Sequence, residues 1–330
     1  MKRIIISLAV AIVFMNAAAG GNVVDSLYLD MRTSFHQQVG EGGYDSQIRG
    51  EHLNIHFHGH VAPQLNYRIR HSLCKKVYDE KNMFNATDIM YLNWNPNEKW
   101  SILAGKYAVL IGGYEYDATP IDVYYYSKFC NSIDQGFTFG ASVTRHFNSA
   151  QALVMQICNS PLALGKSGIY AYNFAWTGRF AQWWHTIWTL NFVESPDRNF
   201  INYISLGNHF NFGKSILDID VMNRGALGQK RFLFSDMTII SKFIWSIGDW
   251  NICAKAGYEW NDSANVRSDG TAYDMVIAPG VEYVYAGCGL EWFPFGRDKI
   301  RLHAVVYNDS DLNRSNVEMG LTWRFDVIRR

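Results

Sequence analysis

Apolar and polar residues alternate along most of this chain, and no other feature limits its possible folds as strongly. From residue 250 to residue 260 every second residue is apolar, and the residues between are small or polar. The same alternation recurs in residues 27–36, 170–177 and 316–325. A β-strand places successive side chains on opposite faces, so each segment would have one apolar and one polar face. The sequence therefore predicts an all-β protein.

The connections between the predicted strands alternate in length. Short connections are expected near residues 61–64, 95–99, 148–150, 178–182, 212–214, 247–249 and 294–298. Longer polar connections are expected near residues 38–47, 75–86, 111–132, 159–168, 194–200, 223–232, 261–276 and 308–314. A soluble sandwich allows either kind of turn at both ends, whereas short and long connections alternate in an outer-membrane barrel. We therefore predict a transmembrane antiparallel β-barrel of about sixteen strands, with an apolar face toward lipid and a polar lumen.

Aromatic residues gather beside the short connections, as an interfacial girdle of a membrane barrel requires. They are Trp94, Trp100, Phe180, Trp183, Trp184, Phe210, Phe212, Trp245, Trp250, Trp292, Phe293 and Phe295. The last predicted strand carries Trp323 and Phe325 on its apolar face, close to the C-terminus. Membrane lipid is therefore an expected partner.

The first residues are typical of a secretory signal peptide. Lys2 and Arg3 precede an apolar run at residues 4–14, and three alanines follow at residues 17–19. We expect residues 1–19 to be removed on export and residues 20–330 to form one barrel in the bacterial outer membrane. The chain contains 30 basic and 30 acidic residues, so the charge balance argues against a nucleic-acid partner. Five dispersed cysteines show no metal-binding spacing, and we predict no metal site or cofactor.

The longest predicted loop, residues 111–132, is the candidate for a constriction inside the barrel. Its tyrosines and acidic residues suit a loop packed inward, and we single out Tyr114, Glu115, Asp117 and Asp122. A surface loop packed on its neighbours is the alternative.

Basic side chains on the predicted polar face are the candidates for lining the pore. They are Arg32, Arg68, Arg70, Lys106, Lys128, Lys242, Lys255 and Arg301. Acidic residues share this face, namely Asp30, Asp218, Asp220, Glu259 and Glu318. Strict alternation from Trp100 would turn Lys106 toward lipid, so its assignment requires a bulge near Gly105, and a lysine at the rim is the alternative.

Four histidines at positions 52, 56, 58 and 60 also share one predicted face. His56 and His58 would lie about 7 Å apart along a strand, so a metal site would need a ligand from a neighbouring strand. A polar lumen lining explains the same pattern.

Two short segments resemble the phosphate-selective porin O and P family. One is Ala104-Gly105-Lys106-Tyr107 with the following Gly112-Gly113-Tyr114-Glu115, and the other is Gln135-Gly136-Phe137-Thr138-Phe139-Gly140. The resemblance implies a sixteen-stranded barrel, trimeric in the family, that passes small solutes and in some members anions. Phosphate specificity would require several convergent cations, whereas loop 111–132 offers Lys128 against three acidic residues.

The sequence thus predicts a porin, through which small hydrophilic solutes or anions diffuse passively along a water-filled lumen. A plugged transporter for hydrophobic solutes is the alternative, and an outer-membrane barrel enzyme is a further one. Neither a G-x-S-x-G elbow nor an H-E-x-x-H helix occurs in the sequence, and we predict no enzymatic activity.

Overall fold

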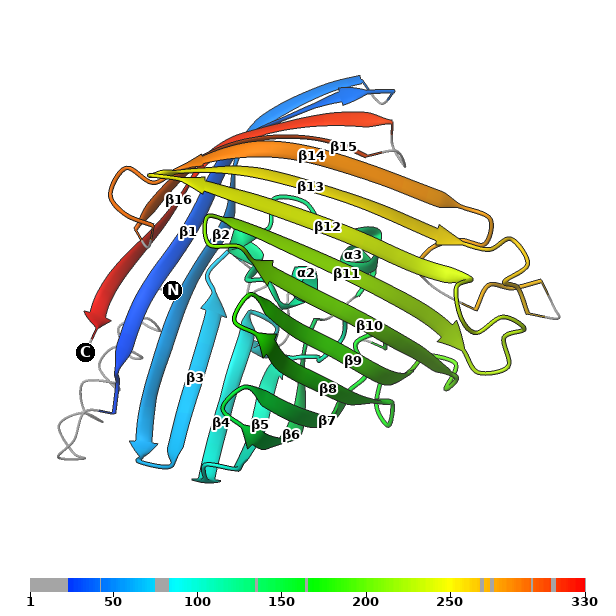
Figure 1. Ribbon diagram of the computed structural model, residues 1–330, viewed down its shortest axis with the longest axis horizontal. Helices are drawn as coiled ribbons and strands as arrows, with labels where there is room; N and C mark the ends of the chain where they lie inside the picture. Colours follow the sequence, from blue (N-terminus) through cyan, green and yellow to red (C-terminus); the bar gives the residue numbers. More distant parts are fainter. Residues whose placement is uncertain are drawn as a thin grey trace.

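The strands close into a single antiparallel barrel, as the sequence predicts. The computed structural model describes residues 23–41, 43–74, 83–133, 136–163, 166–267, 270–273, 276–297, 299–309 and 313–329. Within these residues sixteen strands pair in sequence order, and β1 closes the sheet against β16 (Figure 1). The predicted signal peptide, residues 1–19, lies outside the described residues.

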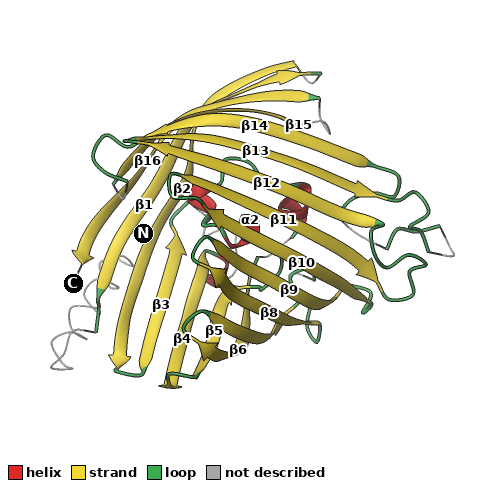
Figure 2. Cartoon of the chain, in the orientation of Figure 1, coloured by secondary structure: helices red, strands yellow, loops and turns green. Residues whose placement is uncertain are grey.

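The strands are β1 (Ser26–Gly40), β2 (Gly43–Ala62), β3 (Leu65–Ser72), β4 (Thr87–Asn97), β5 (Trp100–Ala108), β6 (Phe137–Asn148), β7 (Gln151–Asn159), β8 (Tyr170–Ala181), β9 (Trp184–Glu194), β10 (Phe200–Asn211), β11 (Ser215–Ala226), β12 (Asp236–Ile247), β13 (Trp250–Asn261), β14 (Glu282–Trp292), β15 (Ile300–Asp309) and β16 (Arg314–Arg329). The helical turns are η1 (Met83–Asn85), α2 (Tyr114–Asp117), η2 (Pro120–Asp122) and α3 (Lys128–Ser132). Figure 2 shows α2 and α3 inside the ring of strands. No helix in the described part of the chain combines the length and apolarity needed to cross a membrane.

The two faces of the wall differ as a membrane barrel requires. Leu290 and Val306 are about half exposed on the outer face, whereas Glu259 and Glu318 are fully buried on the inner face. A soluble protein would bury the first pair and expose the second. Because each strand pairs on both sides, the backbone polar groups of the wall are satisfied within the sheet.

The predicted short turns occur where expected, and aromatic rings pack beside them. Trp183 stacks near Phe210 and Phe212, with ring centroids 6.1 Å apart in both cases. Trp250 and Trp292, paired across β13 and β14, stack at 5.6 Å. These rings form the interfacial girdle at the short-turn end of the barrel.

The predicted long loop at residues 38–47 is wrong. Strands β1 and β2 continue through this region as one hairpin that pairs Gly40 with Gly43, and β16 accompanies β1 to Arg314. The polar sequence there lets both faces of the hairpin contact water. A register shift between Arg32 and Thr33 marks a bulge at Glu51, which turns this carboxylate toward the side chains of Arg32 and Ser34.

Candidate functional site: the inward loop and the lumen

The connection between β5 and β6 folds into the barrel, as we expected for residues 111–132. Its described part, residues 109–133, carries α2, η2 and α3. Its hydrogen bonds reach side chains on β1, β11, β13, β14 and β15, on the far side of the lumen from β5 and β6. The alternative of a surface loop is therefore excluded.

Helix α2 is held by a carboxylate on the barrel wall. Asp220 on β11 accepts hydrogen bonds from the backbone N–H groups of Tyr114, at 2.9 Å, and Glu115, at 2.8 Å. These N–H groups have no partner within the helix, so a carboxylate satisfies them well. A Cβ atom on Gly113 would lie 2.1 Å from the Asp220 carboxylate, and only glycine permits this close approach.

Helix α3 is held in the same way by a second wall carboxylate. Glu259 on β13 accepts from the backbone N–H groups of Lys128, at 2.6 Å, and Phe129, at 3.1 Å. Thr238 donates a third hydrogen bond to Glu259 at 2.8 Å. The fully buried Arg224 lies over the Phe129 ring, 5.6 Å from its centroid, and is paired with Asp236.

Glu115 is a buried internal anchor of the loop. It forms an ion pair with Lys255 on β13 and accepts a hydrogen bond from the backbone N–H of Ser127 at 3.0 Å. Burial alone would raise the pKa of the Glu115 carboxyl, but Lys255 and the hydrogen-bond donors outweigh burial and lower it. Lys255 also donates to the backbone carbonyl of Tyr125 at 2.6 Å, so this wall lysine joins two parts of the loop.

The middle of the loop is hydrogen-bonded to strands β1 and β15 of the wall. Arg32 on β1 donates to the carbonyl oxygens of Ile121 and Val123, at 3.2 and 2.8 Å. Arg301 on β15 donates to the Asp122 carboxylate at 2.8 Å and to the Ile121 carbonyl at 2.9 Å. The loop thus bridges the lumen and is fixed at both ends and in the middle.

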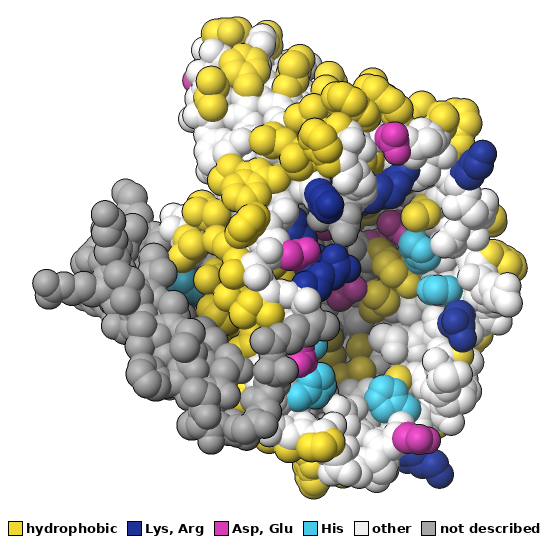
Figure 3. Space-filling view, turned by 90° about the vertical axis from the view of Figure 1, so that its left-hand side faces the viewer, with side chains coloured by type: hydrophobic (Ala, Val, Ile, Leu, Met, Phe, Trp, Pro, Cys, Tyr) yellow, Lys and Arg dark blue, Asp and Glu magenta, His cyan; other side chains and the backbone are white. Residues whose placement is uncertain are grey.

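Cavities lie between the loop and the wall, and two of them are lined by residues of the described strands. The larger one has a volume of about 550 Å³ and lies against β9 to β15. The smaller one has a volume of about 240 Å³ and lies beside η2, between β1–β3 and β15–β16. The end view in Figure 3, from the left-hand side of Figure 1, shows a hollow whose walls carry basic, acidic and histidine side chains.

The predicted loop residues play different parts in this arrangement. Tyr114, Asp117 and Asp122 line the larger cavity, and Asp122 also lines the smaller one. Glu115 reaches the same cavity but is committed to Lys255. Burial raises the pKa of the Asp117 carboxyl.

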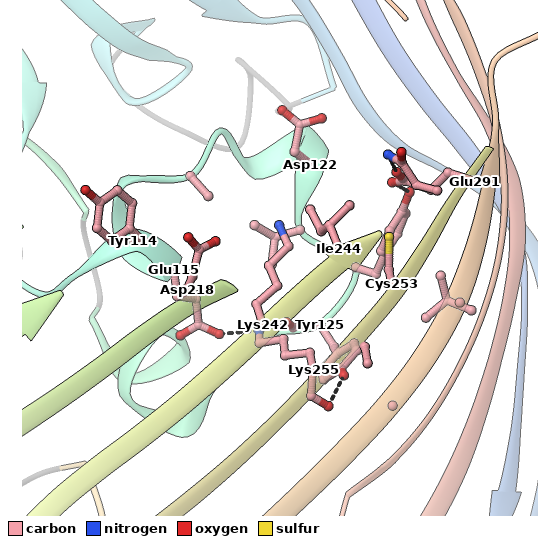
Figure 4. A pocket seen from close by; sticks show the side chains of 18 of the residues that line it. Tyr114, Glu115, Asp122, Tyr125, Asp218, Lys242, Ile244, Cys253, Lys255 and Glu291 are labelled. Atoms are coloured by element: carbon pink, nitrogen blue, oxygen red, sulfur yellow. Dashed lines mark hydrogen bonds and ion pairs between the residues drawn. The ribbon is translucent and has the colours of Figure 1, made fainter. Parts of the chain in front are cut away.

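The predicted basic residues divide into loop anchors and cavity-lining groups. Arg32, Lys255 and Arg301 bind the loop, whereas Lys242 and Arg68 line the larger and the smaller cavity respectively. Figure 4 shows Lys242 extending from β12 into the larger cavity.

Two further predicted cations are Arg70 on β3 and Lys128 on α3. Arg70 is buried, 3.5 Å from the Asp88 carboxylate and over the Phe137 ring. Lys128 lies on α3, 3.9 Å from Asp309 and 5.0 Å from the centre of the Tyr283 ring.

Lys106 does not face the lumen, and its pore-lining assignment is wrong. It is paired in register with Phe139, which is exposed on the outer face, and the pairing of β5 with β6 has no register shift at Gly105. Its ammonium group donates to the Phe84 carbonyl at 2.6 Å and is buried. Lys106 is therefore a lysine at the outer rim, covered by the segment around η1.

Three of the four histidines of β2 contact other side chains. The Nε2–H of His56 donates to the Asp30 carboxylate at 2.8 Å, and the His56 ring stacks on Tyr28 at 4.2 Å between centroids. His58 and His60 lie edge to face at 5.9 Å. Among the described residues, no three His, Cys, Asp or Glu side chains are arranged to hold a metal ion.

Sequence reasoning missed a row of residues that crosses three strands. His185 on β9 is paired with His209 on β10, and His209 is paired with Asp218 on β11. The His209 ring lies 2.6 Å from Asp218 and contacts Tyr114 of the loop at 5.3 Å between centroids. Only the strand register could have revealed this row, because the residues are not periodic in the sequence.

Comparisons with known proteins agree with this barrel fold. The model of the family named phosphate-selective porin O and P matches residues 26–181. This region includes the two segments on which the resemblance rested. The resemblance to that family is confirmed. The match covers β1 to β8 and the inward loop. No curated protein matches the chain.

Solved structures of outer-membrane porins share the fold across nearly the whole chain. OmpF of Salmonella typhi, in a complex with daunomycin, is 9% identical with a TM-score of 0.64, covering 91% of this chain and 97% of that one. An anion-selective porin from Comamonas acidovorans is 9% identical with a TM-score of 0.61, covering 91% and 99%. OmpT of Vibrio cholerae, in a trimer form, is 10% identical with a TM-score of 0.61, covering 92% and 99%. At these identities the likeness concerns the fold.

Proposed function

We propose that this protein is an outer-membrane porin through which small hydrophilic solutes diffuse passively. The observation that carries the proposal is the loop of residues 109–133, which narrows the lumen but leaves cavities of about 550 and 240 Å³ beside it. A solute would pass between the loop and the wall. No chemical step is needed, because the barrel separates the solute from lipid and the polar inner face keeps the path hydrated.

The smaller cavity supports a modest preference for anions. Its described lining contains more basic than acidic residues, namely Arg68, Arg297, Lys299, Arg301 and Arg324 against Asp30 and Asp122. Arg301 is paired with Asp122 and Arg324 with Asp326, and Asp30 is hydrogen-bonded to His56. The excess of positive charge therefore comes from Arg68, Arg297 and Lys299. A mouth with excess positive charge would raise the local concentration of anions.

The larger cavity argues against phosphate specificity. Of its basic residues, Lys255 is paired with Glu115 and Arg301 with Asp122 and Glu291. A multiply charged anion must exchange its hydration shell for several converging donors, and within the described lining this leaves Lys242 and Arg297 as the cations without an ion pair. We therefore propose a general pore rather than a phosphate channel.

A homotrimer is the assembly we propose, on the strength of the family and of the trimeric V. cholerae porin that shares the fold. Light scattering of the detergent-solubilised protein would test it. A mass of three chains would support the trimer, and a mass of one chain would refute it.

Single-channel recording of the mature chain in a planar bilayer tests the pore. Stable open steps with a reversal potential displaced toward that of chloride in asymmetric KCl are expected. A folded, inserted barrel with no open steps would refute the porin function, and a reversal potential displaced toward that of potassium would refute the anion preference.

A further inference from the structure

The lumen wall beside the inward loop carries a band of apolar residues. Ile244 on β12 is paired with Cys253 on β13, Cys253 with Gly289 on β14, and Gly289 with Val305 on β15. All four residues line the larger cavity. We call these four residues the apolar band. General diffusion does not require it, because polar side chains hydrate a lumen better.

One lysine stands beside the apolar band without an ion pair. Lys242 is two residues before Ile244 on the same face of β12, and within the described residues it makes no ion pair or side-chain hydrogen bond. Its two neighbours in register are engaged elsewhere, Asp218 with His209 and Lys255 with Glu115. Figure 4 shows Lys242, Ile244 and Cys253 directed into the cavity.

The acidic groups near Lys242 are also satisfied by other partners. Glu291 accepts hydrogen bonds from Tyr124 at 2.6 Å and from Asn251 at 2.8 Å, and it lies 3.5 Å from Arg301. Asp117 on α2 lines the same cavity, and partial desolvation of its carboxyl raises its pKa, which disfavours its charge. Lys242 and Arg297 are thus the two lining cations without an ion pair among the described residues, and of these two it is Lys242 that stands beside the apolar band.

Aromatic side chains of the loop face the apolar band. Tyr124 contacts His303, two residues before Val305, at 4.7 Å between ring centroids. The Tyr125 hydroxyl donates to the Lys255 carbonyl at 2.9 Å, beside Gly287, where a Cβ would lie 2.7 Å from that hydroxyl. The cavity is therefore bounded by apolar groups on the wall and by tyrosine rings on the loop.

We propose that this cavity is a binding subsite for small organic anions that combine one carboxylate with an apolar body, such as aromatic monocarboxylates. The carboxylate would pair with Lys242, and the body would lie on the apolar band beneath Tyr124 and Tyr125. This inference rests on the proposed pore function and names a class of solute that the pore would favour. Inorganic phosphate gains nothing from the apolar surface and needs more cations than Lys242.

Block of single-channel KCl current by added anions tests the subsite. The probes are sodium benzoate, sodium acetate and sodium phosphate. Benzoate and acetate carry the same charge but differ in their apolar body, and phosphate is an anion without an apolar body. Benzoate is expected to block at roughly tenfold lower concentration than acetate, the factor expected for burying part of an aromatic ring. Equal block by benzoate and acetate, or stronger block by phosphate, would overturn the proposal.

Three variants locate the effect. Lys242→Gln should remove the benzoate block, and Ile244→Asn should bring benzoate close to acetate while leaving acetate unchanged. Lys214→Gln is the matched control, because it removes the same charge from the turn between β10 and β11, outside both cavities. Native-like benzoate block in Lys242→Gln would overturn the proposed site.

A second measurement separates the subsite from the pore. If bilayers stay silent, the porin function fails, and the subsite is then judged by fluorine NMR of 4-fluorobenzoate with the folded protein in detergent. Line broadening that is present in the native protein and lost in Lys242→Gln would support the subsite. Equal broadening in both proteins, or none in either, would overturn it.

Discussion

Replacing Asp220 by alanine should loosen the inward loop without disturbing the barrel. The Asp220 carboxylate accepts two hydrogen bonds at the start of α2, from the backbone of Tyr114 and of Glu115. Removing this acceptor leaves two backbone N–H groups without a partner, at about 1–3 kcal/mol each, so the alanine variant should destabilise the docked segment by about 2–6 kcal/mol. Asparagine retains one acceptor oxygen, and it should cost about half as much.

The loss is local, because other anchors remain. Glu259, Lys255 and Arg301 still hold the rest of the loop. A loss of about 3 kcal/mol raises the population of the undocked segment by about a hundredfold. Single-channel recordings should therefore show brief, frequent transitions to a higher conductance. Because the docked state still predominates, the free energy of unfolding in urea should fall by a similar amount, while the barrel itself stays folded.

Asp218→Ala provides the matched control for the Asp220 variants. Asp218 lies two residues away on the same face of β11 and lines the same cavity, but its hydrogen bond goes to His209 rather than to the loop. Both substitutions remove one carboxyl group from the lumen. If the two variants had the same conductance and the same noise, or if Asp220→Ala matched the native channel, the anchoring role of Asp220 would be refuted.

Three further predictions follow from the wall and the loop. Arginine at Ala254, on the lipid face of β13, should destabilise the folded barrel by about 2–4 kcal/mol, measured by urea unfolding in lipid vesicles; an unchanged midpoint would reverse our inside-outside assignment. Because the pKa of Glu115 is lowered, its ion pair with Lys255 should persist as pH falls below the usual glutamate range and should break only in stronger acid. The break should appear as a rise in current noise, and the channel of the Glu115→Gln variant should be noisy already at pH 7. Lys106→Gln should leave conductance and reversal potential unchanged, because Lys106 lies on the outer face, and an altered reversal potential would contradict that placement.

The strand plan could be predicted because it depends on local alternation and on turn spacing. The segments around Trp250 and Trp323 place apolar side chains on one face, and the structure turns that face outward. The hairpin of β1 and β2 could not be predicted in the same way. Beyond the bilayer both faces contact water, so the strand sequence from Gln37 to Ser46 is as polar as a loop.

The candidate site was only partly predictable from sequence. The loop of residues 111–132 was identified by its length and tyrosine content, but its anchors depend on strand register. Asp220 and Glu259 lie 106 and 131 residues beyond their partners Tyr114 and Lys128, and nothing local to either carboxylate indicates this contact. The bulge at Glu51 likewise changes which side chains face Arg32, and alternation alone cannot detect it.

The separation between the loop and its anchors has a consequence for the order of assembly. The loop is made with the first six strands, yet α2 and α3 dock on β11 and β13, which are synthesised later. Contacts this distant in the chain form late in folding, after shorter-range pairings have restricted the chain. A barrel that is still closing would therefore have an undivided, wide lumen, and the narrow passage would appear only when the C-terminal half of the wall is in place.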